Sequence, residues 1–216
     1  MVAADKKAMG AMRQLCLFLL VALLAGCGAQ KQAAVPTGAT VLVLGDSISY
    51  GTGADTGEDY PHLLAGDTGW RIINAGVPGD TSADGLARLP ALLDQHAPRL
   101  LLVELGGNDF LKHLPRAETA ANLEAILTLS RKRGIPAVLL GIPRPNLFGA
   151  AVGRLGDDPI FEEIASDTNT PLIGGVVGDV LSSRELKSDP VHPNAAGYRR
   201  LAAGLREALK GLGFLR

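Results

Sequence analysis

The sequence predicts an α/β protein, a three-layer α/β/α sandwich built around a parallel central sheet. From Thr40 onward, short apolar runs alternate with stretches in which leucine recurs at helical spacing. This alternation is typical of parallel strands that crossover helices connect. The apolar runs are nearly continuous, as expected for strands that helices cover on both faces. A length of 216 residues with 47% apolar residues is sufficient for one such domain.

Five apolar runs are expected to form the strands. In chain order they are TVLVL, RIIN, LLLVEL, AVLLG and LI, at residues 40–44, 71–74, 100–105, 137–141 and 172–173. Because both faces of the sheet are covered, these runs should supply much of the hydrophobic core.

Three leucine-rich stretches are expected to form helices that pack on this sheet. The first covers residues 82–96, and Ser82 is expected to cap its start. The second covers residues 116–133 and stops at Gly134, a common helix terminator. The third is the C-terminal helix, which is expected to begin at Pro193.

Four polar or glycine-rich segments lie where a parallel sheet places its ligands. In sheets of this class, ligands bind beyond the carboxyl ends of the strands. Three segments directly follow the first three strands, and the fourth precedes the C-terminal helix. They are Gly-Asp-Ser at 45–47, NAGVPGDTS at 74–82, Gly-Gly-Asn-Asp at 106–109 and DPVHPN at 189–194.

Together these segments contain the groups that acyl transfer requires. A serine hydroxyl is a weak nucleophile until a base removes its proton, and His192 can be the base for Ser47. Asp189 can fix the tautomer of that imidazole and stabilise its charged form. Backbone N–H groups of Ser47 and Gly79, with the side-chain amide of Asn108, can form an oxyanion hole. Such a site needs neither a metal nor a cofactor, and none is expected.

At these positions the chain resembles the SGNH or GDSL hydrolases, named for Ser, Gly, Asn and His in four such blocks. It is most similar to the bacterial periplasmic thioesterase, arylesterase and lysophospholipase type, along residues 74–93 and 100–111. The resemblance implies the SGNH fold with its flavodoxin-like sheet. It also implies hydrolysis of carboxylic esters, acyl thioesters or lysophospholipids through an acyl-enzyme, with Asp189 completing the triad. Residues 110–115 and 142–155 would border the acyl pocket, and the candidate substrate-binding residues are Phe110, Leu111, Ile142 and Pro143.

Two other functions remain open from the sequence. A carbohydrate O-acetylesterase can use the same triad, because one fold serves several substrates. A non-catalytic lipoprotein that binds acyl chains or glycans is the alternative from another class. A nucleic-acid partner is not expected, since 21 basic side chains are balanced by 22 acidic ones. The oligomeric state is not predicted.

Two polar side chains near the expected site are expected to have structural roles. Ser49 is a rival nucleophile on paper, but it lies past the tight turn that exposes Ser47. Glu104 is an acid near the end of an apolar strand, and a buried hydrogen-bonding role is the expectation for it.

The N-terminal segment predicts export. Arg13 precedes an apolar run at residues 15–24 that, as a helix of about 15 Å, is too short to span a bilayer. The plan is that of a signal peptide, expected here at residues 1–26.

The residues after the apolar run predict a lipid anchor. Leu24-Ala25-Gly26-Cys27 resembles the bacterial lipobox, in which the cysteine is lipidated and becomes the first residue of the mature chain. An ordinary secretory cleavage near a cysteine is the alternative. We therefore expect a membrane-anchored lipoprotein facing the periplasm or cell exterior, with a tether at 27–38 and the hydrolase domain at 39–216.

Overall fold

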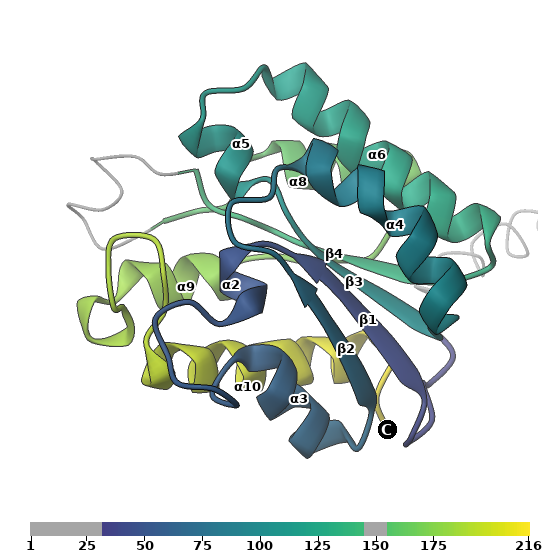
Figure 1. The fold of residues 1–216 in the computed structure, drawn as a ribbon, viewed down its shortest axis with the longest axis horizontal. Helices are drawn as coiled ribbons and strands as arrows, with labels where there is room; N and C mark the ends of the chain where they lie inside the picture. Colours follow the sequence, from purple (N-terminus) through teal and green to yellow (C-terminus); the bar gives the residue numbers. More distant parts are fainter. Residues whose placement is uncertain (1–31, 145–154) are drawn as a thin grey trace, which may run out of the picture. The chain divides into compact units, whose positions relative to one another are not determined.

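The computed structural model describes residues 32–144 and 155–216, and a five-stranded parallel sheet forms the centre of this part (Figure 1). The spatial order is β2-β1-β3-β4-β5, the flavodoxin-like order that the resemblance implies. All five expected strands are present, with ends that differ by at most two residues. Their bounds are β1 (Thr40–Gly45), β2 (Arg71–Gly76), β3 (Leu100–Glu104), β4 (Ala137–Leu140) and β5 (Leu172–Ile173).

Helices cover both faces of the sheet, which confirms the three-layer sandwich (Figure 1). On one face α4 packs beside α6 and α6 beside α8, and on the other face α10 packs beside α3 and α9. The short helices α2 and α5 begin beyond the carboxyl ends of β1 and β3. The helices are α2 (Ser47–Tyr50), α3 (Tyr60–Thr68), α4 (Ser82–His96), α5 (Gly107–Leu111), α6 (Arg116–Lys132), α8 (Ile160–Thr168), α9 (Val176–Ser182) and α10 (Ala195–Leu212), with a 3₁₀ turn at Arg184–Leu186.

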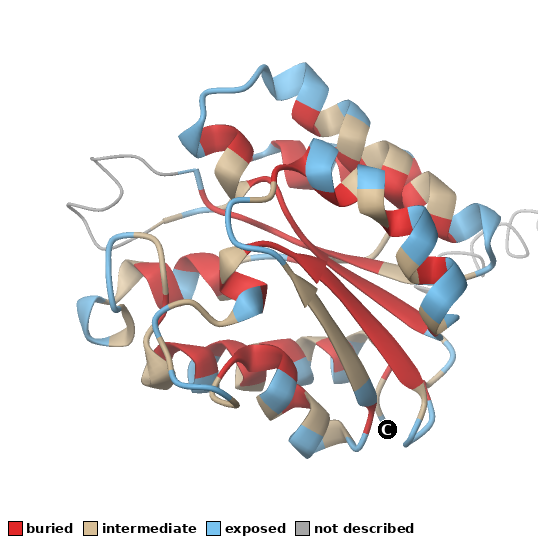
Figure 2. Cartoon of the chain, in the orientation of Figure 1, coloured by how far each residue is buried: buried red, intermediate tan, exposed pale blue. Residues whose placement is uncertain are grey.

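The sheet supplies the centre of the core, as its apolar runs predict. Every residue of β1 and β3 is buried, whereas the edge strand β2 is only half-buried (Figure 2). The register places Gly45 opposite both Gly76 and Glu104. The carboxyl ends of β1, β2 and β3 are therefore level, and the loops that follow them leave the sheet at one edge.

Two helix starts differ from the expectation. The N-cap of α4 is Thr81, which accepts from the N–H of Asp84 while the Asp84 carboxylate accepts from the N–H of Thr81. The side chain of Ser82, the expected cap, donates instead to Asp109. The C-terminal helix begins at Ala195 rather than at Pro193.

The start of α10 depends on a side-chain acceptor that proline lacks. Asn194 accepts a hydrogen bond from the backbone N–H of Gly197 and so satisfies one of the free donors of the first turn. Its amide also donates to the carbonyl of Glu185 at 2.8 Å, which ties the helix start to the preceding loop.

Part of the expected tether at 27–38 packs against the domain. Val35, in the described part of the expected tether, is buried, and its N–H donates to the carbonyl of Phe214 at 2.9 Å. Its own carbonyl accepts from the Trp70 indole at 3.1 Å. These contacts attach the stretch to the domain, because both partners belong to it. The expected signal peptide, Cys27 and the start of the tether lie outside the described residues.

Within residues 32–144 and 155–216, no helix is both long and apolar enough to cross a membrane.

Candidate active site

Ser47 lies at the start of a one-turn helix just beyond the sheet. Asp46 caps that helix, since its carboxylate accepts from the N–H of Ile48 at 3.0 Å. Gly45 ends β1 because no larger residue fits there: a Cβ atom would lie 2.0 Å from the hydroxyl oxygen of Ser49. The segment Gly-Asp-Ser thus leaves the strand and turns at once into α2, which places Ser47 at the edge of the sheet.

A chain of hydrogen bonds links Ser47, His192 and Asp189. The Nε2 atom of His192 lies 2.9 Å from Ser47 Oγ, and its Nδ1 atom lies 2.7 Å from Asp189 Oδ2. The other oxygen of Asp189 accepts the backbone N–H groups of Val191 and His192, both at 2.9 Å. Because Asp189 accepts from Nδ1, that nitrogen carries the hydrogen and leaves Nε2 free to accept the serine proton.

The environment of Asp189 favours its charged form. Burial alone would raise the pKa of this carboxyl, but hydrogen bonds from the His192 ring and from the N–H groups of Val191 and His192 outweigh it. The net effect lowers the pKa of Asp189 below its usual value, so the carboxylate is ionised at neutral pH and faces the imidazole as an anion.

The expected oxyanion groups lie around one cavity together with His192. This cavity has a volume of about 260 Å³, and Ser47, Gly79, Asn108 and His192 all line it. Gly79 has a φ of +86°, a conformation that suits glycine, in the loop between β2 and α4. Lys112 donates to the Gly79 carbonyl at 2.8 Å and so attaches α5 to this loop.

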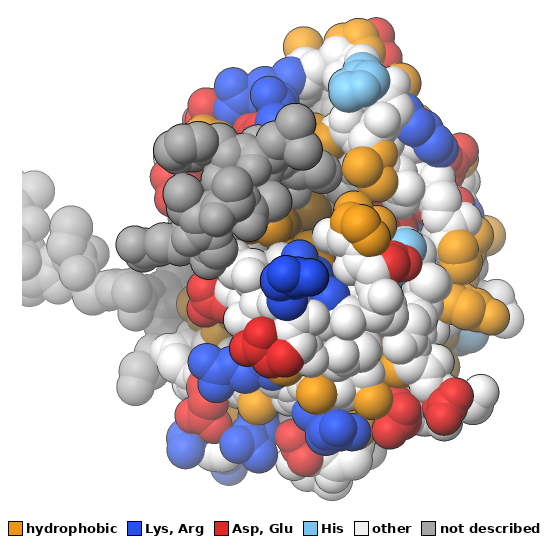
Figure 3. Space-filling view, turned by 90° about the vertical axis from the view of Figure 1, so that its left-hand side faces the viewer, with side chains coloured by type: hydrophobic (Ala, Val, Ile, Leu, Met, Phe, Trp, Pro, Cys, Tyr) orange, Lys and Arg blue, Asp and Glu red, His pale blue; other side chains and the backbone are white. Residues whose placement is uncertain are grey.

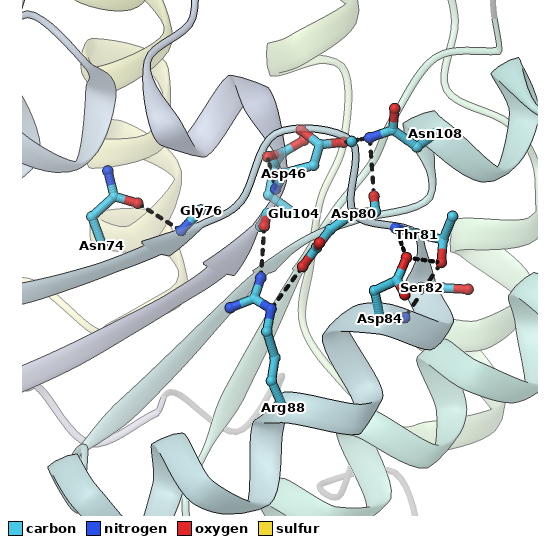
Figure 4. A network of polar contacts seen from close by, with 12 residues as sticks. Asp46, Asn74, Gly76, Asp80, Thr81, Ser82, Asp84, Arg88, Glu104 and Asn108 are labelled. Atoms are coloured by element: carbon cyan, nitrogen blue, oxygen red, sulfur yellow. Dashed lines mark hydrogen bonds and ion pairs between the residues drawn. The ribbon is translucent and has the colours of Figure 1, made fainter.

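The amide of Asn108 is held by two acceptors (Figure 4). Its Nδ2 atom donates to Asp46 Oδ2 at 3.0 Å and to the Asp80 carbonyl at 2.9 Å. Both acceptors require a nitrogen at this position, which fixes the orientation of the amide. The two bonds use both of its hydrogens, so donation to an oxyanion requires that one hydrogen be shared.

An ion pair holds the loop that carries Asp80. The guanidinium of Arg88, on α4, donates to Asp80 Oδ2 at 2.7 Å and to the Gly45 carbonyl at 2.9 Å. The end of β1 and the loop after β2 are thereby connected through one side chain. The sequence offered no signal for this pairing, because Arg88 looks like an ordinary polar residue on a helix face.

The cavity has an apolar wall, to which three of the four expected substrate-binding residues contribute. Leu111, Ile142 and Pro143 line the cavity together with Leu181 and Val191. Apolar side chains also reach the surface at this end of the sheet (Figure 3). Tyr50, Val77 and Leu111, in the segments that follow β1, β2 and β3, are exposed.

Phe110 differs from the expectation, because it does not line this cavity. Its ring is buried and meets the ring of Phe161 edge-on, with the centroids 6.2 Å apart. The Arg144 guanidinium lies 5.3 Å from the centroid of the same ring. Neighbouring residues on a helix point about 100° apart, so Phe110 packs inward while Leu111 faces the cavity. Of the expected border at 142–155, residues 145–154 lie outside the described part.

Two buried acids, Asp46 and Glu104, lie next to the helix that begins at Ser47. Glu104 is fully buried, and its Oε2 atom accepts from Ser49 Oγ at 2.7 Å and from the Ser49 N–H at 3.2 Å. Ser49 Oγ is in turn 2.7 Å from the hydroxyl of Tyr60. Ser49 is fully buried and bonds to both Tyr60 and Glu104. These bonds confirm the buried hydrogen-bonding role expected for Glu104.

Burial raises the pKa of both acids. For Glu104 the pKa is well above its ordinary value, because the carboxyl is buried and the charge of Asp46 is close. For Asp46 burial raises the pKa to about 6, against hydrogen bonds that favour its charged form. Within the described residues, no group of three or more His, Cys, Asp or Glu side chains could hold a metal ion.

Comparison with known proteins agrees with this geometry. Residues 43–200 match the GDSL-like Lipase/Acylhydrolase family. The chain is 37% identical to esterase TesA of Pseudomonas aeruginosa over 88% of its own length and 98% of that protein. It is 34% identical to thioesterase 1/protease 1/lysophospholipase L1 of Escherichia coli, over 80% and 84% of the two chains. A crystal structure of TesA superposes with a TM-score of 0.71 at 36% identity, over 80% of this chain and 99% of that one. The chain thus belongs to the GDSL-like lipase/acylhydrolase family and is an ester-hydrolysing serine hydrolase, as the resemblance in its sequence predicts.

Proposed function

We propose that this protein hydrolyses carboxylic esters and acyl thioesters with Ser47 as its nucleophile. The observation that carries the proposal is the continuous hydrogen-bonded chain from Ser47 through His192 to Asp189, at a cavity with an apolar wall. The family assigns the reaction class, and the geometry supports the assignment of these three residues to it.

The reaction follows from the contacts of the triad. Ser47 Oγ attacks the acyl carbonyl while its proton passes to His192 Nε2, and Asp189 stabilises the resulting imidazolium. The imidazolium then donates that proton to the departing alcohol or thiol, which leaves an acyl group on Ser47. A water molecule gives a proton to His192 and attacks the acyl-enzyme, and the returning proton restores the serine.

The charge on the tetrahedral intermediate faces three donors. The backbone N–H groups of Ser47 and Gly79 and the Asn108 amide are assigned to it, because these residues share one cavity. The donors belong to a folded frame, so they need little reorganisation when the oxyanion forms.

The cavity wall favours an acyl chain over a sugar. Side chains such as Ile142, Leu181 and Val191 offer no hydrogen-bond partners to hydroxyl groups. Esters and thioesters of aliphatic acids, with lysophospholipids among them, are therefore the proposed substrates, and acetylated carbohydrates are the second candidate. Rates on p-nitrophenyl esters of increasing length, acyl-CoAs, lysophospholipids and acetylated sugars will rank these classes.

The nucleophile is tested with a fluorophosphonate probe and peptide mapping. The probe should label Ser47, and Ser47→Ala should lose both labelling and turnover while the melting temperature changes little. Ser166→Ala, an exposed serine on α8, is the matched control and should keep both. Labelling at another serine, or turnover that survives in Ser47→Ala, would contradict the assignment.

We further propose that the mature protein is a lipoprotein anchored through Cys27. The support is the lipobox-like LAGC and the short apolar run before it. Cys27→Ser should release active enzyme from the membrane fraction and abolish incorporation of labelled palmitate. A wild-type protein that is soluble and unlabelled would instead indicate an ordinary secretory signal.

A further inference from the structure

Helix α5 carries Asn108, but little in the helix itself fixes its direction. It has five residues, far fewer than an isolated helix needs to be stable in water. Gly106 and Gly107 lie between β3 and Asn108, and glycine leaves the backbone many conformations. The N-cap of the helix is Gly106, which has no side chain to bond to the first turn. The position of Asn108 must therefore be set by contacts of α5 with other elements.

The residue after Asn108 makes a buried, directional contact of this kind. The Asp109 carboxylate has an exposed fraction of 1%, and it binds Ser82 with both oxygens. Oδ2 accepts from the Ser82 N–H at 2.8 Å, and Oδ1 accepts from Ser82 Oγ at 2.5 Å. The other contacts of α5 restrict its direction less, because Phe110 packs through apolar rings on Phe161 and the bond from Lys112 is exposed to solvent.

Ser82 is a firm point of attachment, because helix α4 begins there. It is the first residue of a 15-residue helix, whose free backbone N–H groups favour a negative charge at this end. Ser82 Oγ also accepts from Asn122 Nδ2 at 3.1 Å, on α6. The same hydroxyl thus donates to Asp109 and accepts from Asn122, and α5 is connected to two long helices through one buried side chain.

The loop before α4 is in turn attached to the strand that leads to Ser47. Arg88 joins Asp80 to the Gly45 carbonyl, at the end of β1 (Figure 4). The Asp80 carbonyl accepts from Asn108 Nδ2 at 2.9 Å, and the bonds between Asp109 and Ser82 lie directly beside this contact in the sequence. Since Arg88 fixes the loop independently of α5, loss of the Asp109 contact should displace α5 and leave the loop in place.

We propose that Asp109 is a positioning residue: its paired bonds to Ser82 fix α5 against the start of α4 and thereby hold the Asn108 amide at the oxyanion. The inference rests on the proposed function, in which Asn108 contacts the oxyanion. Asp109 does not line the catalytic cavity, so it acts through its neighbour and not on the substrate. A displaced oxyanion donor weakens the transition state more than the bound ester, so the loss should appear in kcat and not in KM.

Two substitutions weaken this contact to different extents. Asp109→Asn keeps the size of the side chain but replaces one acceptor with a donor, so one of the two Ser82 donors faces an amide nitrogen. On a soluble p-nitrophenyl ester, kcat should fall about tenfold or more while KM stays within about twofold. Ser82→Ala removes only the hydroxyl and should lower kcat about threefold. Fluorophosphonate titration to its endpoint expresses kcat per reactive Ser47, which restricts the comparison to folded enzyme.

The matched control is Ser130→Ala, which removes another buried hydroxyl. Ser130 is fully buried on α6, and its Oγ donates to the Ile135 carbonyl at 2.9 Å. It does not line the catalytic cavity. The unfolding free energy should fall by a similar amount in Ser130→Ala and Ser82→Ala, because each loses one buried hydrogen bond. Only Ser82→Ala should lower kcat, and an equal loss of kcat in the control would contradict the inference.

A double-mutant cycle shows whether Asp109 acts through Asn108. Once residue 108 is alanine, no amide is left to position, so Asp109→Asn in the Asn108→Ala background should lower kcat by no more than about threefold. The same tenfold fall in both backgrounds would show that Asp109 supports the fold in general, and the inference would be wrong. A wild-type kcat in Asp109→Asn, or a change confined to KM, would also overturn it. Turnover that survives in Ser47→Ala would instead overturn the proposed function, whatever the Asp109 variants show.

Discussion

Gly76 is a residue at which the addition of a single methyl group should strongly impair catalysis. It ends β2, and its Cα faces the one-turn helix that carries Ser47. A Cβ atom at this position would lie 2.3 Å from the Tyr50 nitrogen, 2.7 Å from the Ser49 carbonyl carbon and 2.9 Å from the Asp46 carbonyl oxygen. All three are backbone atoms, so no side-chain rotation can relieve the collision.

The size of the effect follows from these distances. Ordinary contacts of a Cβ atom begin at 3.4 Å, so α2 must move away from β2 by about 1 Å in Gly76→Ala. Helix α2 begins at Ser47, whose hydroxyl lies 2.9 Å from His192 Nε2, and that hydrogen bond would be lost or misdirected. A misplacement of about 1 Å can lower a rate about a hundredfold, which corresponds to about 2.7 kcal/mol in the barrier.

The assay is kcat on a soluble ester at a temperature where circular dichroism shows the variant to be folded. Gly66→Ala is the matched control: Gly66 is exposed on α3, and a Cβ atom there meets nothing within 4 Å. The control should keep kcat and gain up to about 1 kcal/mol in unfolding free energy, because alanine favours a helix over glycine. A kcat for Gly76→Ala within about threefold of wild type would show that contact with β2 does not fix the position of α2.

Three further predictions use other parts of the site. Asn108→Ala should lower kcat by about a hundredfold or more with a smaller change in KM, measured on the same ester; a change in KM alone would make Asn108 a ground-state contact. Glu104→Gln should flatten the pH dependence of the unfolding free energy. Glutamic acid in the unfolded chain has a pKa of about 4.3, and the pKa of Glu104 in the folded protein is raised. Above that pH the unfolded chain releases a proton that the folded chain keeps, so the unfolding free energy of the wild type should fall as pH rises. Urea titrations that give wild type and variant the same dependence of unfolding free energy on pH would contradict this. Leu111→Ala should raise KM for long-chain esters by an amount equivalent to about 1 kcal/mol and leave KM for acetate esters unaffected. The reason is that Leu111 lines the cavity with a partly exposed side chain. An equal rise in KM for esters of every chain length would show that Leu111 does not contact the acyl chain.

The sheet and the order of its loops were predictable because they depend on local patterns. Strands β1 and β3 are buried on both faces, so their sequences are almost wholly apolar and their ends are sharp. The residues that follow the apolar runs, Gly45 and Gly106, then mark where the chain leaves the sheet. Parallel register brings those exits to one edge, which is why the sequence alone could assign Ser47 and Asn108 to one site.

What the sequence could not show depends on contacts between distant segments. Arg88 and Asp80 are eight residues apart in a helix and a loop, and only the fold reveals that they hold the end of β1 as well. Phe110 and Leu111 are adjacent apolar residues, and only the direction of α5 decides which of them faces the cavity. Ser82 was the expected N-cap of α4, but its side chain donates to the distant Asp109 and Thr81 takes the cap position.

The motif Gly-Asp-Ser is best understood from what lies beneath it. Glycine is required at residue 45 because the Ser49 side chain, which bonds to Glu104, occupies the space that a Cβ atom would need. Asp46 is required both to cap α2 through Ile48 and to hold the Asn108 amide.

Glu104 is linked to both residues before the nucleophile: its bond with Ser49 leaves space only for glycine at residue 45, and its Oε2 atom accepts from the Asp46 N–H at 3.5 Å. An acid at the end of β3 would be only a cost to folding if it acted alone. Since its Oε2 atom accepts from the N–H and the hydroxyl of Ser49, it connects the nucleophile's helix to the strand that leads to the oxyanion donor. Replacing Glu104 should therefore lower the rate of catalysis even in variants that still fold.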